Sequence, residues 1–398
     1  MSSAGGRHFL QIPGPTNVPE RVLRAVARPT IDHRGPEFAR LTHEILAALK
    51  ELFHNRDGDV MIFPASGSGA WEAALVNTLS PGDRVLMFDH GFFARGWCGI
   101  AERLGLEVDL VPSDWRQPVD PAAVEERLRA EGDAPYGAVA VVHSETSTGV
   151  CSDIAAIRTA IDRAGHGALL LVDAVSSLAS MPLPQDEWGV DVVVTGSQKG
   201  LMLPPGLSFN SVSAKALAAS DNATLRRAYW DWEALRAQNA RGFFPYTPAT
   251  NLLFGLSEAL AMLREEGEAA VFARHDRLAA ATRAAVQAWG LETYCADPAN
   301  ASSSLTAVMT PDGVDADAVR QVILDNFDMS LGTGLGPLQG KLFRIGHLGE
   351  LNELALGGAL GGVEMGLRLA GVPFRAGGVT AALESLATEA AAASATAS

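Results

Sequence analysis

The stretch Val192-Val193-Val194-Thr195-Gly196-Ser197-Gln198-Lys199-Gly200 decides the fold: an apolar β-branched run breaks into a turn of small residues that ends in a lysine. An earlier run, Ala168-Leu169-Leu170-Leu171-Val172-Asp173, ends in an aspartate. Continuous apolar runs of this length are typical of strands buried on both faces of a parallel sheet. Ligands bind at the carboxyl ends of such strands, so both side chains are predicted at a binding edge.

An amine and a carboxylate at such an edge suit pyridoxal phosphate. The lysine would hold the cofactor covalently, and the aspartate would pair with its ring nitrogen. Each residue alone has a simpler interpretation, because many strands end in a solvated loop lysine or in an aspartate that caps the next helix.

Strands and helices alternate outward from this stretch. Apolar strands are predicted at 60–63, 85–88, 107–111, 138–143, 168–173 and 190–195, and helices at 36–53, 70–79, 95–104 and 154–164. This alternation predicts an α/β fold with a mostly parallel sheet covered on both faces. Long helices follow at 251–265 and 269–289, and Ser/Thr-rich strands from Leu291 onward predict a smaller α+β domain.

A chain of 398 residues is long enough for two domains. We expect an extended N-terminal segment near the active site, a large domain, a small C-terminal domain and a frayed tail rich in Ala, Ser and Thr. These units are predicted to span residues 1–20, 21–275, 276–378 and 379–398.

The formal net charge of −15 argues against nucleic acid or anionic membrane as a partner, but not against a small anionic substrate. No apolar run is long enough to span a bilayer, and the first six residues lack the apolar core of a signal peptide. A cytoplasmic location is expected. Cys98, Cys151 and Cys295 fit neither a zinc pattern nor a disulfide framework, and the histidines show no metal spacing, so no metal is expected.

Two further motifs could carry chemistry. Ser66-Gly67-Ser68-Gly69-Ala70-Trp71-Glu72 follows a strand and opens a helix, which suits a phosphate or is simply a tight turn. It is neither a P-loop nor a complete dinucleotide fingerprint. Phe343-Arg344-Ile345-Gly346-His347 places an arginine in an apolar segment, where it would grip a carboxylate or form an internal salt bridge.

Together these stretches resemble the class V aminotransferases of pyridoxal phosphate fold type I, in the alanine/serine–glyoxylate branch, and most closely the bacterial serine–glyoxylate enzymes. The resemblance runs in family order from residue 9 to about 370. It is carried by Pro13-Gly14-Pro15-Thr16-Asn17, Asp32-His33-Arg34-Gly35-Pro36-Glu37-Phe38, Ser66-Gly67-Ser68-Gly69, Glu145-Thr146-Ser147-Thr148-Gly149, Asp173-Ala174-Val175-Ser176-Ser177, Gly196-Ser197-Gln198-Lys199-Gly200 and Gly340-Lys341-Leu342-Phe343-Arg344-Ile345-Gly346-His347.

The resemblance implies a role for each matching position. Lys199 and Asp173 would be catalytic, and both would contact the cofactor. Its other contacts would be Ser68, Gly69, Ala70 and Gln198 at the phosphate, Thr146 near the ring hydroxyl and Phe93 stacked on the ring, where many relatives have tryptophan. Arg344 would bind the substrate α-carboxylate, and Pro13 and Gly14 would line the substrate side.

The neighbouring subunit would help to hold the phosphate through Thr247, which implies a homodimer with shared active sites. Some relatives have tyrosine where Phe244 stands, and phenylalanine cannot donate a hydrogen bond, so the role of Phe244 stays open.

The implied activity is transamination from a small L-amino acid, with serine favoured, to glyoxylate, giving glycine and a 2-oxo acid such as hydroxypyruvate. Alanine and aspartate are alternative donors. Aspartate would require a second cation, for which Arg34 and Arg95 are candidates unless they are ordinary surface or salt-bridge residues. A lyase of the cysteine desulfurase type is a further alternative, but residues 325–349 contain no cysteine for it. A nicotinamide oxidoreductase or a silent scaffold would leave Lys199 unexplained.

Overall fold

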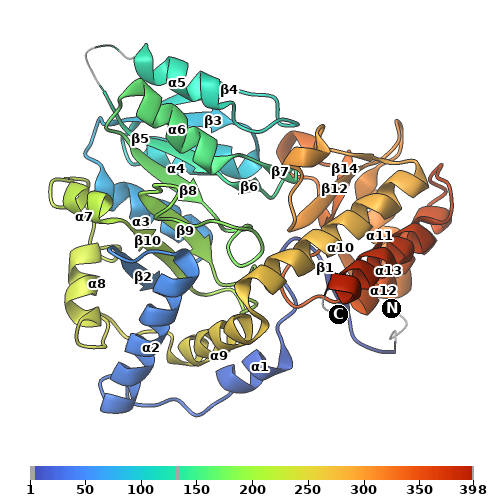
Figure 1. The fold of residues 1–398 in the computed structure, drawn as a ribbon, viewed down its shortest axis with the longest axis horizontal. Coiled ribbons are helices and arrows are strands. Elements are labelled where there is room, and N and C mark those ends of the chain that lie inside the picture. The colour runs from blue at the N-terminus through green and yellow to red at the C-terminus, as the bar shows by residue number, and fades with distance from the viewer. Residues whose placement is uncertain (1–4, 131, 133–134, 397–398) are drawn as a thin grey trace.

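The computed structural model describes residues 5–130, 132 and 135–396, and it divides into a large and a small domain (Figure 1). The large domain contains a seven-stranded sheet in the order β2-β10-β9-β8-β5-β3-β4. Its strands are β2 (Asp59–Phe63), β3 (Arg84–Asp89), β4 (Glu107–Pro112), β5 (Tyr136–Val142), β8 (Leu169–Asp173), β9 (Val192–Gly196) and β10 (Ser208–Val212). The short strands β6 (Ser144–Glu145) and β7 (Val150–Cys151) form a separate pair.

The predicted parallel sheet is confirmed from β4 through β3, β5 and β8 to β9. Strand β10 was not predicted, and it runs antiparallel to both β9 and β2. Its sequence hides it, because three of its five residues are polar yet buried. Two of these are satisfied by hydrogen bonds, from Asn210 Nδ2 to the Ala70 carbonyl at 2.9 Å and from Ser211 Oγ to Gln185 Oε1 at 2.5 Å.

Helices cover both faces of this sheet, with α3 and α4 on one side and α5 and α6 on the other (Figure 1). Local sequence explains their bounds: Asp153 caps α6 by accepting from Ala156 N, and Gly165 ends it with φ of 66°. The helices of this domain are α1 (Glu20–Val26), α2 (Pro36–Phe53), α3 (Gly67–Thr78), α4 (Phe92–Arg103), α5 (Pro121–Arg129), α6 (Ile154–Ala164), α7 (Ala214–Ser220), α8 (Trp232–Asn239) and α9 (Thr250–Glu266).

The small domain is built on a five-stranded sheet in the order β1-β13-β14-β12-β11. Its edge strand β1 comes from the N-terminal segment and pairs parallel with β13, so this segment joins the small sheet. The strands are β1 (Phe9–Gln11), β11 (Glu292–Thr293), β12 (Leu305–Met309), β13 (Met329–Thr333) and β14 (Leu342–Gly346), and the helices are α10 (Glu268–Trp289), α11 (Ala316–Phe327), α12 (Glu353–Leu369) and α13 (Gly378–Thr396), with single 3₁₀ turns η1 (Pro298–Asn300) and η2 (Gly336–Leu338).

The small domain begins and ends with a helix that packs into its core. Helix α10 contributes Val271 to the core of the large domain and Leu278 to that of the small one, so the chain passes between domains within a helix. The tail expected to be frayed instead forms α13, which packs against α10. Its alanines favour a helix, and Ala382 and Leu386, one turn apart, are buried in the small-domain core. No helix in the described part of the chain combines the length and apolarity needed to cross a membrane.

Candidate active site

Lys199 and Asp173 meet at the carboxyl edge of the large sheet. Their strands β8 and β9 are parallel neighbours, with Asp173 opposite Val194, and Lys199 follows β9 in the turn beyond it. Both side chains are buried, with Asp173 3% and Lys199 7% exposed. The spatial relation predicted from the sequence is therefore present.

The Asp173 carboxylate is held by two N–H donors from different elements. Val175 N donates to Oδ1 at 2.7 Å, and the indole N–H of Trp71 in α3 donates to Oδ2 at 3.0 Å. The pKa of Asp173 is raised to about 7: burial has the largest effect and the nearby charge of Glu145 adds to it, while the two donors and Lys199 oppose the shift. Within the described residues no cation lies within ion-pair distance of this carboxylate, so it is suited to pair with a protonated ring nitrogen.

The Lys199 amine is poised between its charged and neutral forms. Its pKa is lowered to about 7: burial has the largest effect and the charge of Arg344 adds to it, while the negative charges of Asp173 and Glu145 oppose the shift. Its Nζ donates to the Pro13 carbonyl. A lysine that is partly neutral near pH 7 can accept a proton, which an ordinary surface lysine cannot.

The N-terminal segment closes over the lysine turn. Thr16 N donates to the Gln198 carbonyl at 3.0 Å, and Thr16 Oγ1 donates to the Lys199 carbonyl at 3.2 Å. Gly14 has φ of +107°, and a Cβ there would stand 2.4 Å from Lys199 Cδ. Only glycine can pass the lysine this closely, and the structure places Pro13 and Gly14 beside the amine.

The start of α3 forms a cradle suited to a phosphate. The helix begins at Gly67, earlier than predicted, and the N–H groups of Gly69 and Ala70 already donate to the Ser66 carbonyl at 2.9 and 3.4 Å. The N–H groups of Gly67 and Ser68 have no partner among the described residues, and helix starts favour anions. Of the predicted phosphate contacts in α3, Ser68 therefore offers a free backbone donor, whereas the N–H groups of Gly69 and Ala70 are already used.

The Gln198 side chain lies beside this cradle. Its Oε1 is buried without a hydrogen-bond partner among the described residues. A Cβ at Gly196 would stand 2.8 Å from that oxygen and 3.4 Å from Gly67 N, so the amide and the helix start share one small space. Among the described residues, the free N–H groups of Gly67 and Ser68 fit the phosphate of pyridoxal phosphate, and a carboxylate that no cation contacts fits its ring nitrogen.

Thr146 and Phe93 lie at the same edge. Thr146 Oγ1 is 2.5 Å from Ser176 Oγ, and Thr146 is buried. The half-buried ring of Phe93, in the first turn of α4, stands edge-on to Trp71 with centroids 6.4 Å apart. Trp71 was not predicted as a site residue, although it lies three positions after Ser68 and so shares its helix face.

Arg344 reaches the site from β14 of the small domain. It is 7% exposed, with Nε donating to the Thr333 carbonyl at 2.8 Å and Nη1 to the Thr146 carbonyl at 2.7 Å. No carboxylate of the described chain lies within ion-pair distance, so the alternative of an internal salt bridge is wrong. Burial lowers the pKa of Arg344 to about 10, which the charge of Glu145 opposes, and the guanidinium stays charged at neutral pH.

Within the described residues, the remaining candidates form no hydrogen bond or ion pair with Lys199, Asp173 or Arg344. Thr247 and Arg34 are exposed, whereas Phe244 is buried with its ring centroid 6.1 Å from that of Phe38. Arg95 forms a two-point ion pair with Asp89, with both N–O distances 2.7 Å, so it is a salt-bridge residue.

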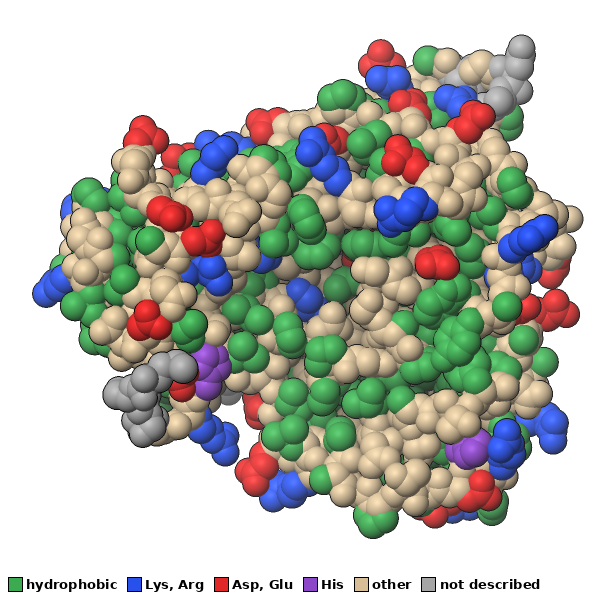
Figure 2. Space-filling model, turned by 180° about the vertical axis from the view of Figure 1, so that it is seen from behind, with side chains coloured by type: hydrophobic (Ala, Val, Ile, Leu, Met, Phe, Trp, Pro, Cys, Tyr) green, Lys and Arg blue, Asp and Glu red, His purple; other side chains and the backbone are tan. Residues whose placement is uncertain are grey.

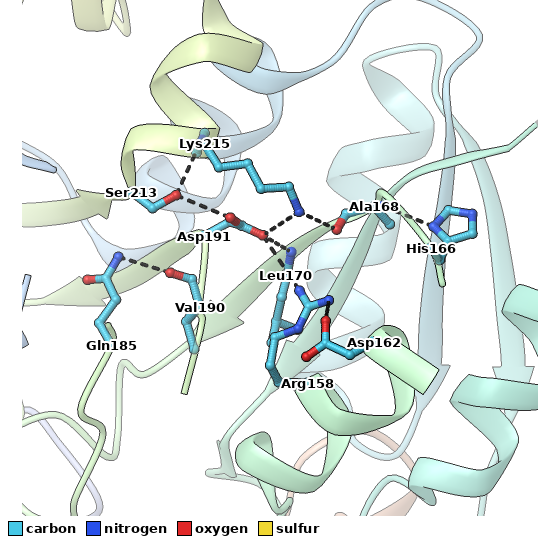
Figure 3. A network of polar contacts seen from close by, with 11 residues as sticks. Arg158, Asp162, His166, Ala168, Leu170, Gln185, Val190, Asp191, Ser213 and Lys215 are labelled. Atoms are coloured by element: carbon cyan, nitrogen blue, oxygen red, sulfur yellow. Dashed lines mark hydrogen bonds and ion pairs between the residues drawn. The ribbon is translucent and has the colours of Figure 1, made fainter. Parts of the chain in front are cut away.

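A second buried carboxylate shows what an ordinary structural aspartate looks like in this fold. Asp191 lies at the opposite end of β9, where it accepts from Leu170 N at 2.9 Å, Ser213 Oγ at 3.2 Å and Lys215 Nζ at 3.3 Å (Figure 3). Its charge is balanced by a lysine of the same chain. No cation of the described residues contacts the Asp173 carboxylate, which distinguishes this site residue from a structural aspartate.

A sequence model described as aminotransferase class-V matches residues 8–336. The chain belongs to the class V aminotransferases. It is 48% identical to the serine–glyoxylate aminotransferase of Methylorubrum extorquens over 96% of both chains. It is 45% identical to the L-aspartate–glyoxylate aminotransferase of Paracoccus denitrificans over 94% of both. The solved ureidoglycine–glyoxylate aminotransferase of Bacillus subtilis superposes with a TM-score of 0.90 at 29% identity, covering 97% of this chain and 99% of that one.

Membership confirms the predicted fold type, and class V aminotransferases depend on pyridoxal phosphate. The residues described above fit that cofactor at three points: the cradle at the start of α3, Asp173 and the amine of Lys199. This aminotransferase therefore acts on an amino acid and a 2-oxo acid.

Proposed function

We propose that this aminotransferase moves the amino group of a small L-amino acid, with serine favoured, to glyoxylate, giving glycine and a 2-oxo acid such as hydroxypyruvate. The observation that carries the proposal is Arg344, a buried guanidinium that forms no ion pair with a carboxylate of the described residues and whose charge reaches the amine of Lys199. A substrate carboxylate bound there would present its α-carbon toward the lysine. The serine–glyoxylate relatives at 48% and 46% identity support serine and glyoxylate.

Each residue of the cluster has a defined task. Pyridoxal phosphate, when bound, supplies an aldehyde that takes up the amino group and a ring that withdraws electrons from the substrate. Lys199 holds the cofactor and then, as a neutral amine, moves the proton at the substrate α-carbon. Asp173 keeps a proton on the ring nitrogen, and the cradle of Ser68 and Gln198 holds the phosphate.

Arg344 explains how one pocket serves both half-reactions. The amino donor and glyoxylate each carry a carboxylate next to the reacting carbon, and a planar guanidinium grips such a group at two points. The carboxylate therefore returns to the same place in both directions. Pro13 and Gly14, which lie against Lys199, keep the substrate side narrow.

Aspartate is the second candidate donor, because one relative at 45% identity is an aspartate–glyoxylate enzyme. Arg95 is engaged by Asp89, which leaves Arg34 as the candidate for a side-chain carboxylate. Alanine needs no polar partner. The lyase alternative is disfavoured, because burial raises the pKa of the Cys98 and Cys151 thiols to about 11.

We also propose a cytoplasmic homodimer with shared active sites, in which Thr247 reaches the phosphate of the neighbouring subunit. Thr247 is exposed on its own chain, as such a contact requires. Hydrophobic side chains gather over the lower half of the large domain, with charged ones mostly around its margin (Figure 2). Light scattering should give twice the mass of 41.8 kDa. A mixture of Lys199→Ala and Thr247→Ala chains, refolded together, should regain activity that neither has alone.

The donor is tested by comparing kcat/KM for serine, alanine and aspartate with glyoxylate as acceptor. The proposal expects the highest value for serine and no turnover in Lys199→Ala. A higher kcat/KM for aspartate would identify the protein as an aspartate–glyoxylate enzyme instead. Transamination that survives in Lys199→Ala would overturn the proposed role of the lysine.

A further inference from the structure

Glu145 is a fully buried carboxylate at the centre of the site, with no task in the mechanism above. It lies at the end of β6, and its oxygens accept four hydrogen bonds. Oε1 accepts from Ser147 Oγ at 2.7 Å, Ser147 N at 2.9 Å and Phe93 N at 3.4 Å, and Oε2 accepts from Ala94 N at 3.1 Å. The side chain thus joins the turn after β6 to the first turn of α4.

Both connected segments carry residues of the cofactor site. The first turn of α4 bears Phe93, and the turn after β6 bears Thr146, whose carbonyl accepts from Arg344 Nη1 at 2.7 Å. The junction is tight, because a Cβ at Gly91 would stand 2.1 Å from Glu145 Cγ. Glycine at 91 therefore admits the carboxylate to the start of α4, where the helix dipole favours a negative charge.

The charge of Glu145 also reaches the three ionisable groups of the site. It raises the pKa values of Lys199, Asp173 and Arg344. Burial is the larger effect on each: it lowers the pKa of Lys199 and Arg344 and raises that of Asp173. Arg344, Asp173 and Glu145 are the charged groups that face Lys199, and they come from β14, β8 and β6.

We propose that Glu145 is the positioning residue of this site. Its carboxylate fixes the positions of Phe93 and Thr146 relative to each other, and it compensates the positive charge of Arg344 and Lys199 until substrate binds. This inference rests on the proposed function, because it assigns Glu145 a task only if Lys199 holds the cofactor. Glu145 itself is not placed in contact with substrate, so it acts through its neighbours.

The test uses Glu145→Gln, which keeps the size of the side chain and removes its charge. The full chain without cofactor is labelled at its amines with formaldehyde and a borane reductant at several pH values. The label on Lys199 is read by peptide mass, which is simple because the sequence contains only four lysines. The labelling midpoint of Lys199 should fall by about one pH unit, so labelling at pH 6 should rise roughly fivefold.

Ser147→Ala is the matched control. It removes the hydroxyl donor and loosens the same junction, yet it leaves the charge of Glu145 in place. A purely structural role would give both variants the same labelling midpoint. An unchanged or raised midpoint in folded Glu145→Gln overturns the proposal.

If Glu145→Gln does not fold, Glu145→Asp decides, because it keeps the charge on a shorter arm. The labelling midpoint of Lys199 should then stay near that of the parent. The affinity for pyridoxal phosphate should fall about tenfold, because Phe93 and Thr146 are no longer held in position. The proposal would be overturned if Glu145→Asp kept both the labelling midpoint of Lys199 and the cofactor affinity of the parent. Borohydride reduction of the parent with pyridoxal phosphate tests the proposed function separately, because a label outside Lys199 would overturn that function whatever Glu145 does.

Discussion

Replacing Lys199 with methionine should stabilise the protein without cofactor while abolishing its activity. The amine is buried with a pKa of about 7, whereas a lysine of the unfolded chain titrates near 10.4. Folding at neutral pH must therefore bury a charge or release a proton. Each unit of pKa shift corresponds to about 1.4 kcal/mol, so the amine costs about 4 kcal/mol of unfolding free energy at pH 7.

The pH dependence of this cost has a definite sign. Because the folded pKa is lowered, the folded state binds fewer protons than the unfolded state between about pH 7 and 10.4. The unfolding free energy of the parent therefore rises with pH across this window, and the cost is largest below pH 7. The advantage of Lys199→Met should shrink from about 4 kcal/mol at pH 7 to about 1 kcal/mol at pH 9.5.

The assay is urea unfolding of the full chain, followed by tryptophan fluorescence at both pH values. Cofactor must be removed, because it would stabilise the parent by mass action. Lys341→Met is the matched control: this lysine is exposed, so its replacement should change stability by no more than about 0.5 kcal/mol. The reasoning would be refuted if Lys199→Met were less stable than the parent at pH 7, or if its gain in unfolding free energy were the same at pH 7 and pH 9.5.

Three further changes probe the same site. Trp71→Phe removes the N–H that favours the Asp173 carboxylate, so the pKa of Asp173 should rise further and equilibrium dialysis should show affinity for pyridoxal phosphate reduced roughly tenfold or more. Arg344→Lys loses the two-point grip, so steady-state kinetics should show kcat/KM reduced about a hundredfold for donor and glyoxylate alike. Gly14→Ala should lower thermal stability by an amount equivalent to roughly 1–3 kcal/mol, because φ is +107° and the lysine lies 2.4 Å from the new Cβ. Gly82→Ala, with φ of +84° and open space around it, is the control that separates backbone strain from the clash.

The strand endings of the sheet were readable from the sequence because continuous apolar runs leave little choice of structure. Such a run places Asp173 and Lys199 at strand ends, and parallel strands bring those ends to one edge. Strand β10 was not readable, since its buried Asn210 and Ser211 depend on partners far away in the chain. The tail was misread because low complexity concealed the i, i+4 pair of Ala382 and Leu386 that α13 buries.

The sequence by itself determined which residue types could do the chemistry: one lysine and one aspartate after apolar runs, and an arginine that an apolar strand would bury. Only the tertiary structure decided their states. Burial lowers the pKa of the Lys199 amine to about 7 and raises that of Asp173 to about 7, and no cation of the described residues contacts the Asp173 carboxylate. It also brings Glu145 and Trp71 into the site through contacts between separate elements. Desolvation and Coulomb interactions depend on all neighbours in space, and no local pattern of residues encodes them.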